Sequence, residues 1–256
     1  VLHSAAEEHY KLGLAYLREP QNTEKAVEHL EEAVELDRSN AEYHFKLAEA
    51  YAEDFSYANI FRKPFLATKV KMQLELAVQH NPSSVRYREG LIQYYMFAPV
   101  LLGGSFKKAR DHAEALRMID SYASLLAHAT VSAEEGEHER AVSYFIGAVR
   151  LRPQRWEAYH RYGMYCLNIH QVDDAIANLK KYVDLVPDTA HSYESLASAY
   201  VRKRMYDEAI KYYDIAIDKD PSLTHLIFRI AQLYEFKGAR FDALRQYQRY
   251  LAVAPG

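Results

Sequence analysis

A period of 34 residues runs through the second half of this 256-residue sequence. Alanine, proline, small residues and large apolar residues each recur at that spacing. The four ladders are Ala141, Ala175, Ala209 and Ala243; Pro153, Pro187, Pro221 and Pro255; Ala129, Gly163, Ala197 and Ala231; and Phe145, Leu179, Tyr213 and Tyr247. Four columns that share one period indicate a repeat protein, in which each repeat is one supersecondary unit that packs on its neighbours.

Within a repeat the apolar residues follow helical spacing. Residues 190–223 show two such runs, one at Tyr193, Leu196, Ala197 and Tyr200, the other at Ala209, Ile210, Tyr213, Ala216 and Ile217. The polar stretch 202–207 separates the runs, and Asp220-Pro221 ends the second. Each repeat is therefore predicted to be a helix hairpin. The small residues let its two helix axes approach closely, and the large residues fill the space between neighbours.

This pattern resembles the tetratricopeptide repeat (TPR) family, which has a large residue, then Leu-Gly, then Tyr, and later Ala, Phe, Ala and Pro. Residues 190–223 carry it at Tyr193, Leu196-Ala197, Tyr200, Ala209, Tyr213, Ala216 and Pro221. Regular repeats are predicted at 122–155, 156–189, 190–223 and 224–256. The resemblance implies an all-α fold, a right-handed superhelical solenoid of about seven hairpins. It forms a single domain over residues 1–256, with four regular repeats over 122–256.

Residues 1–121 hold three less regular repeats, at about 6–40, 41–84 and 85–121. The second carries an insertion at 55–65 and the third an insertion at 98–105, which contains Gly103-Gly104-Ser105. We expect both insertions at the same edge of the solenoid, in contact, as a small apolar core or as a partly exposed partner site. A long second repeat with a Gly-Gly-Ser turn is similar to certain bacterial TPR proteins, many of them exported.

Sequence signatures of catalysis are missing. The chain has no G-x-G-x-x-G, P-loop or H-E-x-x-H pattern. Positive φ in a turn explains the glycines at 103 and 104 better than phosphate binding does. The single cysteine, Cys166, occupies a column that holds tyrosine in other repeats, which predicts a buried packing position and not a nucleophile. We expect no enzyme activity, no cofactor and no metal site.

The charge balance argues against nucleic acid as a partner. The chain has 32 Lys and Arg against 35 Asp and Glu, a net charge of −3. Residues 1–54 hold 5 basic and 13 acidic residues, so the N-terminal end is acidic. The longest apolar stretch, 94–102, is far shorter than the roughly 20 residues of a membrane helix, so no membrane span is expected.

A groove on the concave side is the expected binding surface, because the first helix of each hairpin lines it. The resemblance implies groove residues at fixed positions of that helix: Tyr10, Leu14, Phe45 and Glu49 in the N-terminal repeats, and His160, Met164, His191, Arg202, Phe228, Arg229 and Gln232 in the C-terminal ones. An extended or helical peptide with a carboxylate would suit the C-terminal groove, with Arg229 on the carboxylate and Phe228 or Met164 on apolar side chains.

The leading hypothesis is a non-catalytic scaffold that binds a peptide or protein in this groove. One alternative is self-assembly through the C-terminal repeat, whose Tyr247, Tyr250 and Leu251 would meet another copy. Another is an interaction domain cut from a larger protein. The sequence starts at Val1, and a signal peptide could have been removed, so cytoplasmic and exported locations both stay open.

Overall fold

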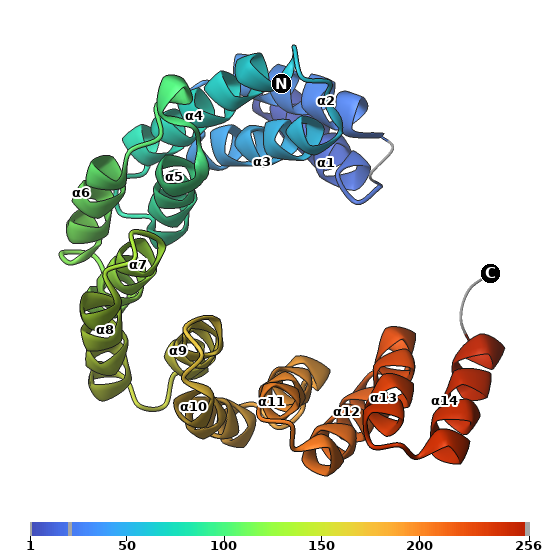
Figure 1. The fold of residues 1–256 in the computed structure, drawn as a ribbon. Coiled ribbons are helices and arrows are strands. Elements are labelled where there is room, and N and C mark those ends of the chain that lie inside the picture. The colour runs from blue at the N-terminus through green and yellow to red at the C-terminus, as the bar shows by residue number, and fades with distance from the viewer. Residues whose placement is uncertain (1, 20–21, 254–256) are drawn as a thin grey trace. The chain divides into compact units, whose positions relative to one another are not determined.

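The fold is all-α in the part of the chain described by the computed structural model, residues 2–19 and 22–253. It contains fourteen α-helices there and no strand, and the chain runs through them as successive hairpins (Figure 1). The helices are α1 (Leu2–Tyr16), α2 (Thr23–Leu36), α3 (Ala41–Tyr57), α4 (Lys63–His80), α5 (Val85–Phe97), α6 (Phe106–Leu116), α7 (Ser121–Glu134), α8 (His138–Leu151), α9 (Trp156–Asn168), α10 (Val172–Leu185), α11 (Ala190–Arg202), α12 (Tyr206–Lys219), α13 (Thr224–Phe236) and α14 (Arg240–Val253). A short 3₁₀ helix, η2 (Val100–Leu102), stands between α5 and α6. The predicted all-α fold of seven hairpins is confirmed.

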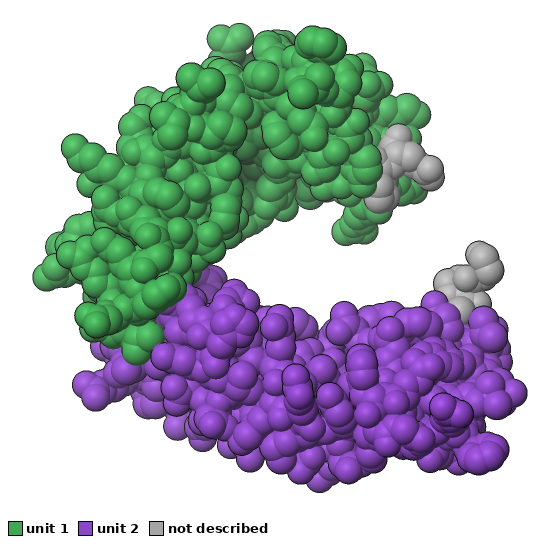
Figure 2. All heavy atoms as spheres, in the orientation of Figure 1, with its two compact units in different colours: residues 1–144 green, residues 145–256 purple. Residues whose placement is uncertain are grey.

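The chain divides into two compact units, Val1–Tyr144 and Phe145–Gly256 (Figure 2). We call them unit 1 and unit 2. The division falls inside the sequence of α8.

Polar side chains fix where several helices of unit 1 begin. The Asn40 side chain accepts hydrogen bonds from the backbone N–H groups of Glu42 and Tyr43 at the start of α3. Asp120 does the same for the first turn of α7. These caps satisfy N–H donors that have no partner within the helix.

The small-residue column has the packing role expected of it. In unit 2, a Cβ atom added to Gly163 of α9 would lie 2.7 Å from Cγ of Leu179 on α10. Leu179 is fully buried in a core that continues through Leu196 and Tyr213 to Ile230. A side chain larger than hydrogen at position 163 would therefore push the two helices of this hairpin apart.

Cys166 belongs to the same core. Its side chain is fully buried, and this burial raises the pKa of the thiol to about 12. The predicted buried packing position of Cys166 is confirmed, because its side chain has no exposed surface in this core.

The insertion at 55–65 mainly lengthens the two helices of its hairpin, α3 and α4, and does not form a separate segment. Helices α3 and α4 have 17 and 18 residues, whereas α11 and α12 have 13 and 14. Only residues 58–62 connect α3 to α4. Pro64 is accommodated in the first turn of α4, where proline removes no helical hydrogen bond.

Candidate functional site

An open groove runs along unit 1 between α3 and α5, and α4 forms its floor. Near the middle of α3 it contains a cavity of about 300 Å³. The lining residues are Phe45, Ala48, Glu49 and Ala52 from α3, Val70 and Leu74 from α4, and Gly90, Gln93 and Tyr94 from α5. Small side chains at several of these positions leave the space that larger ones would fill.

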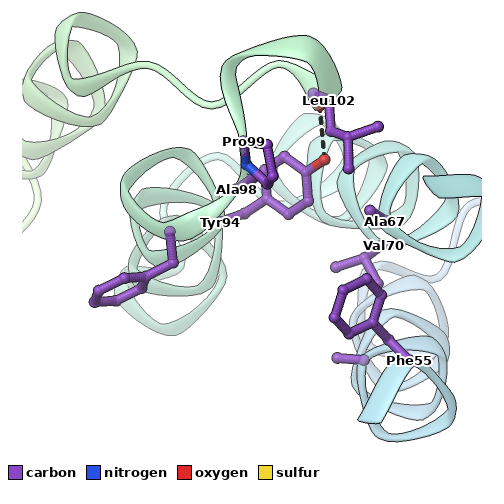
Figure 3. A pocket seen from close by; sticks show the side chains of 9 residues that line it. Phe55, Ala67, Val70, Tyr94, Ala98, Pro99 and Leu102 are labelled. Atoms are coloured by element: carbon purple, nitrogen blue, oxygen red, sulfur yellow. Dashed lines mark hydrogen bonds between the residues drawn. The ribbon is translucent and has the colours of Figure 1, made fainter. Parts of the chain in front are cut away.

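A second cavity, of about 200 Å³, continues this groove toward η2 (Figure 3). Its lining consists of Ala52, Phe55, Ala67, Val70, Tyr94, Phe97, Ala98, Pro99 and Leu102. Ala52, Val70 and Tyr94 line both cavities, so the two form one continuous groove. From Phe45 to Phe55 along α3 it spans about 15 Å, at 1.5 Å per helical residue. Its floor and the end near η2 are apolar.

Tyr94 joins the groove to the Gly-Gly turn. Its hydroxyl donates a hydrogen bond of 2.8 Å to the carbonyl oxygen of Leu102, drawn as the dashed line in Figure 3. Burial, followed by the nearby Glu75 carboxylate, raises the pKa of Tyr94. The phenol therefore keeps the proton that makes this bond at neutral pH.

Glycine is required at the two positions of the turn for different physical reasons. Gly103 has φ of +94°, as expected of a residue that ends η2 in the left-handed region. At Gly104 the reason is space, because an added Cβ would lie 1.8 Å from the carbonyl oxygen of Ala98. The turn packs η2 against α4 and makes it one wall of the groove.

A charged cluster borders the other end of the groove. The Arg86 guanidinium is 3.1 Å and 3.2 Å from the two carboxylate oxygens of Glu42 and 3.4 Å from Glu49. The same guanidinium lies 4.3 Å from the centroid of the Phe45 ring. Glu42 also accepts hydrogen bonds from the hydroxyls of Tyr87, at 2.7 Å, and Tyr10, at 3.4 Å. Burial and the Glu42 carboxylate raise the pKa of each tyrosine to about 12.

Of the four expected N-terminal groove residues, the structure places Phe45 and Glu49 in contact with Arg86, and Tyr10 in contact with Glu42, the ion-pair partner of Arg86. Phe45 is only 6% exposed, so its ring is a wall beneath Arg86 and not a free contact. Leu14 lies on α1 one turn after Tyr10 and is half-buried.

In unit 2 the structure brings His160 and His191 together, with ring centroids 5.0 Å apart. His160 also packs at 4.9 Å on Tyr182. Burial, then the neighbouring His191 and Arg161, lowers the pKa of His160 to about 4. The imidazole is therefore neutral at pH 7.

The other expected residues of unit 2 are exposed to different extents. Phe228 is partly covered by Tyr247 and Tyr250, each with its ring centroid 5.4 Å away. Arg202 is the last residue of α11. Met164, Arg202, Arg229 and Gln232 lie at the surface.

Arg86 and Tyr94 were missed by the sequence analysis. Arg86 occupies the second position of its repeat, as Glu42 does in the preceding one, so the repeat register could have found it. Tyr94 has no such signal, because its role depends on the fold of the insertion that follows it. In that insertion Val100 and Leu101 are exposed, while Ala98, Pro99 and Leu102 line the same apolar cavity as Phe55 of the other insertion.

The described residues contain neither a cluster suited to a metal ion nor a helix suited to spanning a membrane. Within residues 2–19 and 22–253, no three His, Cys, Asp or Glu side chains are grouped so as to hold a metal ion. None of the helices described has the length and apolar character needed to cross a bilayer.

Two family models match this chain. Residues 17–54 match a TPR repeat model, and residues 167–223 match a tetratricopeptide repeat model. A curated relative, mouse "Superkiller complex protein 3", is 24% identical over 224 residues, which cover 84% of this chain. The chain spans only 14% of the length of that relative.

Solved structures share the fold. MamA from Desulfovibrio magneticus RS-1 has a TM-score of 0.53 and 22% identity, covering 66% of this chain and 94% of that protein. PilF of Pseudomonas aeruginosa has a TM-score of 0.52 and 19% identity, covering 100% of this chain and 94% of that protein. The seven hairpins, the small-residue contacts between their helices and the matched segments agree: this chain contains tetratricopeptide repeats.

Proposed function

We propose that the protein is a non-catalytic scaffold that binds a segment of a partner protein in the groove between α3 and α5. The observation that carries this proposal is the continuity of two cavities along one apolar floor. Grooves with apolar floors and a few polar groups at the rim are typical of sites for peptides and small ligands. TPR proteins in general serve protein interactions, and this groove offers a surface for one in unit 1.

The dimensions of the groove limit what it can take. A length of about 15 Å corresponds to four or five residues of extended chain, or to about ten residues of helix. Val70, Leu74 and Tyr94 would contact the apolar side chains of either form. The Gln93 amide at the rim offers both a donor and an acceptor to a peptide backbone. The partner segment would therefore present two or three large apolar side chains on one side.

The C-terminal groove residues are proposed as a second, weaker site in unit 2. Arg229 is exposed and a guanidinium suits a peptide carboxylate, while Met164 and the free part of Phe228 offer apolar contact. Because this surface lies in unit 2, substitutions there can be tested separately from the groove of unit 1.

One observation favours self-association as a second function. Ile210 and Ile217 of α12 are buried under the next hairpin, but the residues 34 positions later, Leu244 and Leu251 of α14, are 57% and 75% exposed. A second copy of the chain could cover them. Light scattering should then show mass rising with concentration, and Leu244→Asp with Leu251→Asp should abolish the rise. A strict monomer at all concentrations would exclude this function.

The scaffold proposal is tested by filling the groove. Ala52 lines both cavities yet is exposed, so Ala52→Trp should block the groove without disturbing the core. The matched control is Ala177→Trp, at an exposed alanine of α10 in unit 2. Affinity capture from the source organism's lysate, read by mass spectrometry, should enrich a protein with wild type and Ala177→Trp but not with Ala52→Trp.

Two other outcomes of the capture experiment would change the proposal. If Arg229→Glu with Phe228→Ala removes the captured protein and Ala52→Trp does not, the partner binds unit 2. If the captured protein survives every groove variant, groove binding is wrong. Circular dichroism on each variant separates lost binding from lost folding.

A further inference from the structure

Two turns of unit 1 carry large apolar side chains into solvent. In the α3–α4 connection, Ile60 and Phe61 are 75% and 89% exposed, and in η2, Val100 and Leu101 are 84% and 98% exposed. Phe65, in the first turn of α4, is also exposed. We call these five residues the tip patch. Large apolar groups are seldom gathered on a free surface without an interaction to make.

The two turns approach the same helix. Helix η2 packs against α4, whose first turn follows Ile60 and Phe61. A Cβ built on Gly103 would lie 3.1 Å from Nζ of Lys71, which is on α4. None of the five tip residues lines either cavity of the groove. A partner seated in the groove would therefore leave the tip patch uncovered.

The surroundings of the tip patch are basic. Segments 55–74 and 97–110 contain seven Lys and Arg and no Asp or Glu, in contrast to the acidic first 54 residues. Four of the seven are paired with carboxylates of other segments; these are Arg62 with Asp54, Lys69 with Glu31, Lys71 with Glu75 and Arg110 with Glu135. Lys63, Lys107 and Lys108 have no carboxylate within 4 Å in the described part of the chain. Lys63 and Lys108 instead lie over the rings of Phe55 and Tyr95, 5.0 Å and 5.2 Å from the ring centroids. Each apolar turn is thus followed by cations whose charge is not neutralised by a carboxylate of the described chain.

We propose that the tip patch docks unit 1 on an anionic lipid surface. The four side chains at the turns enter the boundary between headgroups and acyl chains, while Lys63, Lys107 and Lys108 lie among the lipid phosphates. The tip patch consists of two separate protruding turns, and this shape favours a lipid surface over a folded protein as the partner. A protein partner would need two separate pockets for two protruding turns, whereas a bilayer receives them without a preformed shape. Docking of this kind is peripheral and needs no spanning helix.

The test is sedimentation of the whole chain with vesicles. Vesicles of phosphatidylcholine with about a quarter phosphatidylglycerol supply the anionic surface, and pure phosphatidylcholine is the comparison. Phe61→Asp with Leu101→Asp should lower the partition coefficient at least about tenfold, because each buried methylene favours the membrane. The matched control is Phe241→Asp, at a highly exposed phenylalanine of α14 outside the patch, and it should bind like wild type.

Charge is tested separately. Lys63→Gln and Lys107→Gln should each weaken binding to the anionic vesicles by about fivefold, and added salt should do the same. Lys211→Gln, at an exposed lysine of unit 2, is the control. Ala52→Trp should bind vesicles like wild type, which separates this proposal from binding in the groove.

The proposal is overturned if wild type does not sediment with anionic vesicles, or if the aspartate variants sediment as wild type does. It is also overturned if an acidic amphipathic peptide, and no vesicle, protects the tip patch from hydrogen exchange, because the partner would then be a protein. Far-ultraviolet circular dichroism of each variant checks folding. A variant that unfolds is replaced by Leu101→Ser alone, for which a partition coefficient equal to that of wild type would equally reject the proposal.

Discussion

The hydroxyl of Tyr94 on α5 is hydrogen-bonded, at 2.8 Å, to the carbonyl oxygen of Leu102 in η2. This bond ties the Gly-Gly turn to α5, the helix that precedes it in the same hairpin. Within the turn, Gly104 donates its N–H to Pro99, and Ser105 donates to Tyr95. Together with the backbone bonds from Leu102 to Pro99 and from Gly103 to Val100, these bonds hold the wall in place.

Tyr94→Phe removes only the side-chain bond. We expect the unfolding free energy to fall by about 0.5–1.5 kcal/mol, because the Leu102 carbonyl loses its partner. Urea titration measures this change. Amide exchange should increase in residues 98–105 more than elsewhere. Unchanged exchange in the turn would show that the backbone bonds alone fix it.

Gly163→Ala should destabilise the protein even though alanine is the better helix former. The added methyl would lie 2.7 Å from Cγ of Leu179, and overpacking of this kind costs about 1–3 kcal/mol. The double variant with Leu179→Ala is the control. In that background the clash is gone, and Gly163→Ala should stabilise by about 0.5–1 kcal/mol. A loss of stability in both backgrounds would contradict this explanation of the small-residue column.

The unfolding free energy should fall as the pH is lowered from about 6.5 to 4, in part because of His160. The pKa of His160 is lowered to about 4 in the folded protein, whereas the unfolded side chain titrates near 6.5. The unfolded state thus binds more protons in this range, so stability that is present above pH 6.5 is lost toward pH 4. We expect a contribution on the order of 1 kcal/mol after discounting for solvent screening. Urea titrations of wild type and His160→Phe should diverge in this range, and parallel pH profiles would refute the assignment.

Cys166 should resist alkylation in the native state. Its thiol is fully buried with a pKa raised to about 12, so little thiolate exists at pH 8. Iodoacetamide labelling followed by mass spectrometry should show slow modification, which becomes fast in denaturing urea. Rapid labelling of the folded protein would mean that the hairpin of α9 and α10 opens often.

The regular repeats could be predicted from the sequence because one period fixes both helices and their contact. The polar stretch 202–207 marks the turn that the structure places at residues 203–205, and the column of Gly163 identifies the closest helix contact. The lengthening of α3 and α4 could not be predicted this way. The extra residues interrupt the 34-residue period. Pro64 suggests a break in the helix, but it is tolerated because it lies in the first turn of α4.

The groove was predicted only in outline. The repeat register predicted Tyr10, Phe45 and Glu49 as groove residues, and the structure places them beside the Glu42–Arg86 pair at one end of the groove. The cavities, however, are gaps left where small residues of three helices meet, such as Ala52, Ala67 and Gly90. No spacing along the sequence gives the distance between those helices, so the volume and its continuation to η2 emerge only from packing.

Glu42 has a consequence for how the repeats can be exchanged. Its carboxylate belongs to the second hairpin, yet it accepts hydrogen bonds from Tyr10 of the first and from Arg86 and Tyr87 of the third. Stacked repeats are often treated as interchangeable modules that interact only with their immediate neighbours. Here three hairpins share one acceptor, so grafting any one of them into another array would leave unmatched partners behind. For protein engineering the first three repeats are therefore a single cassette, because the charged cluster at the end of the groove draws on all of them.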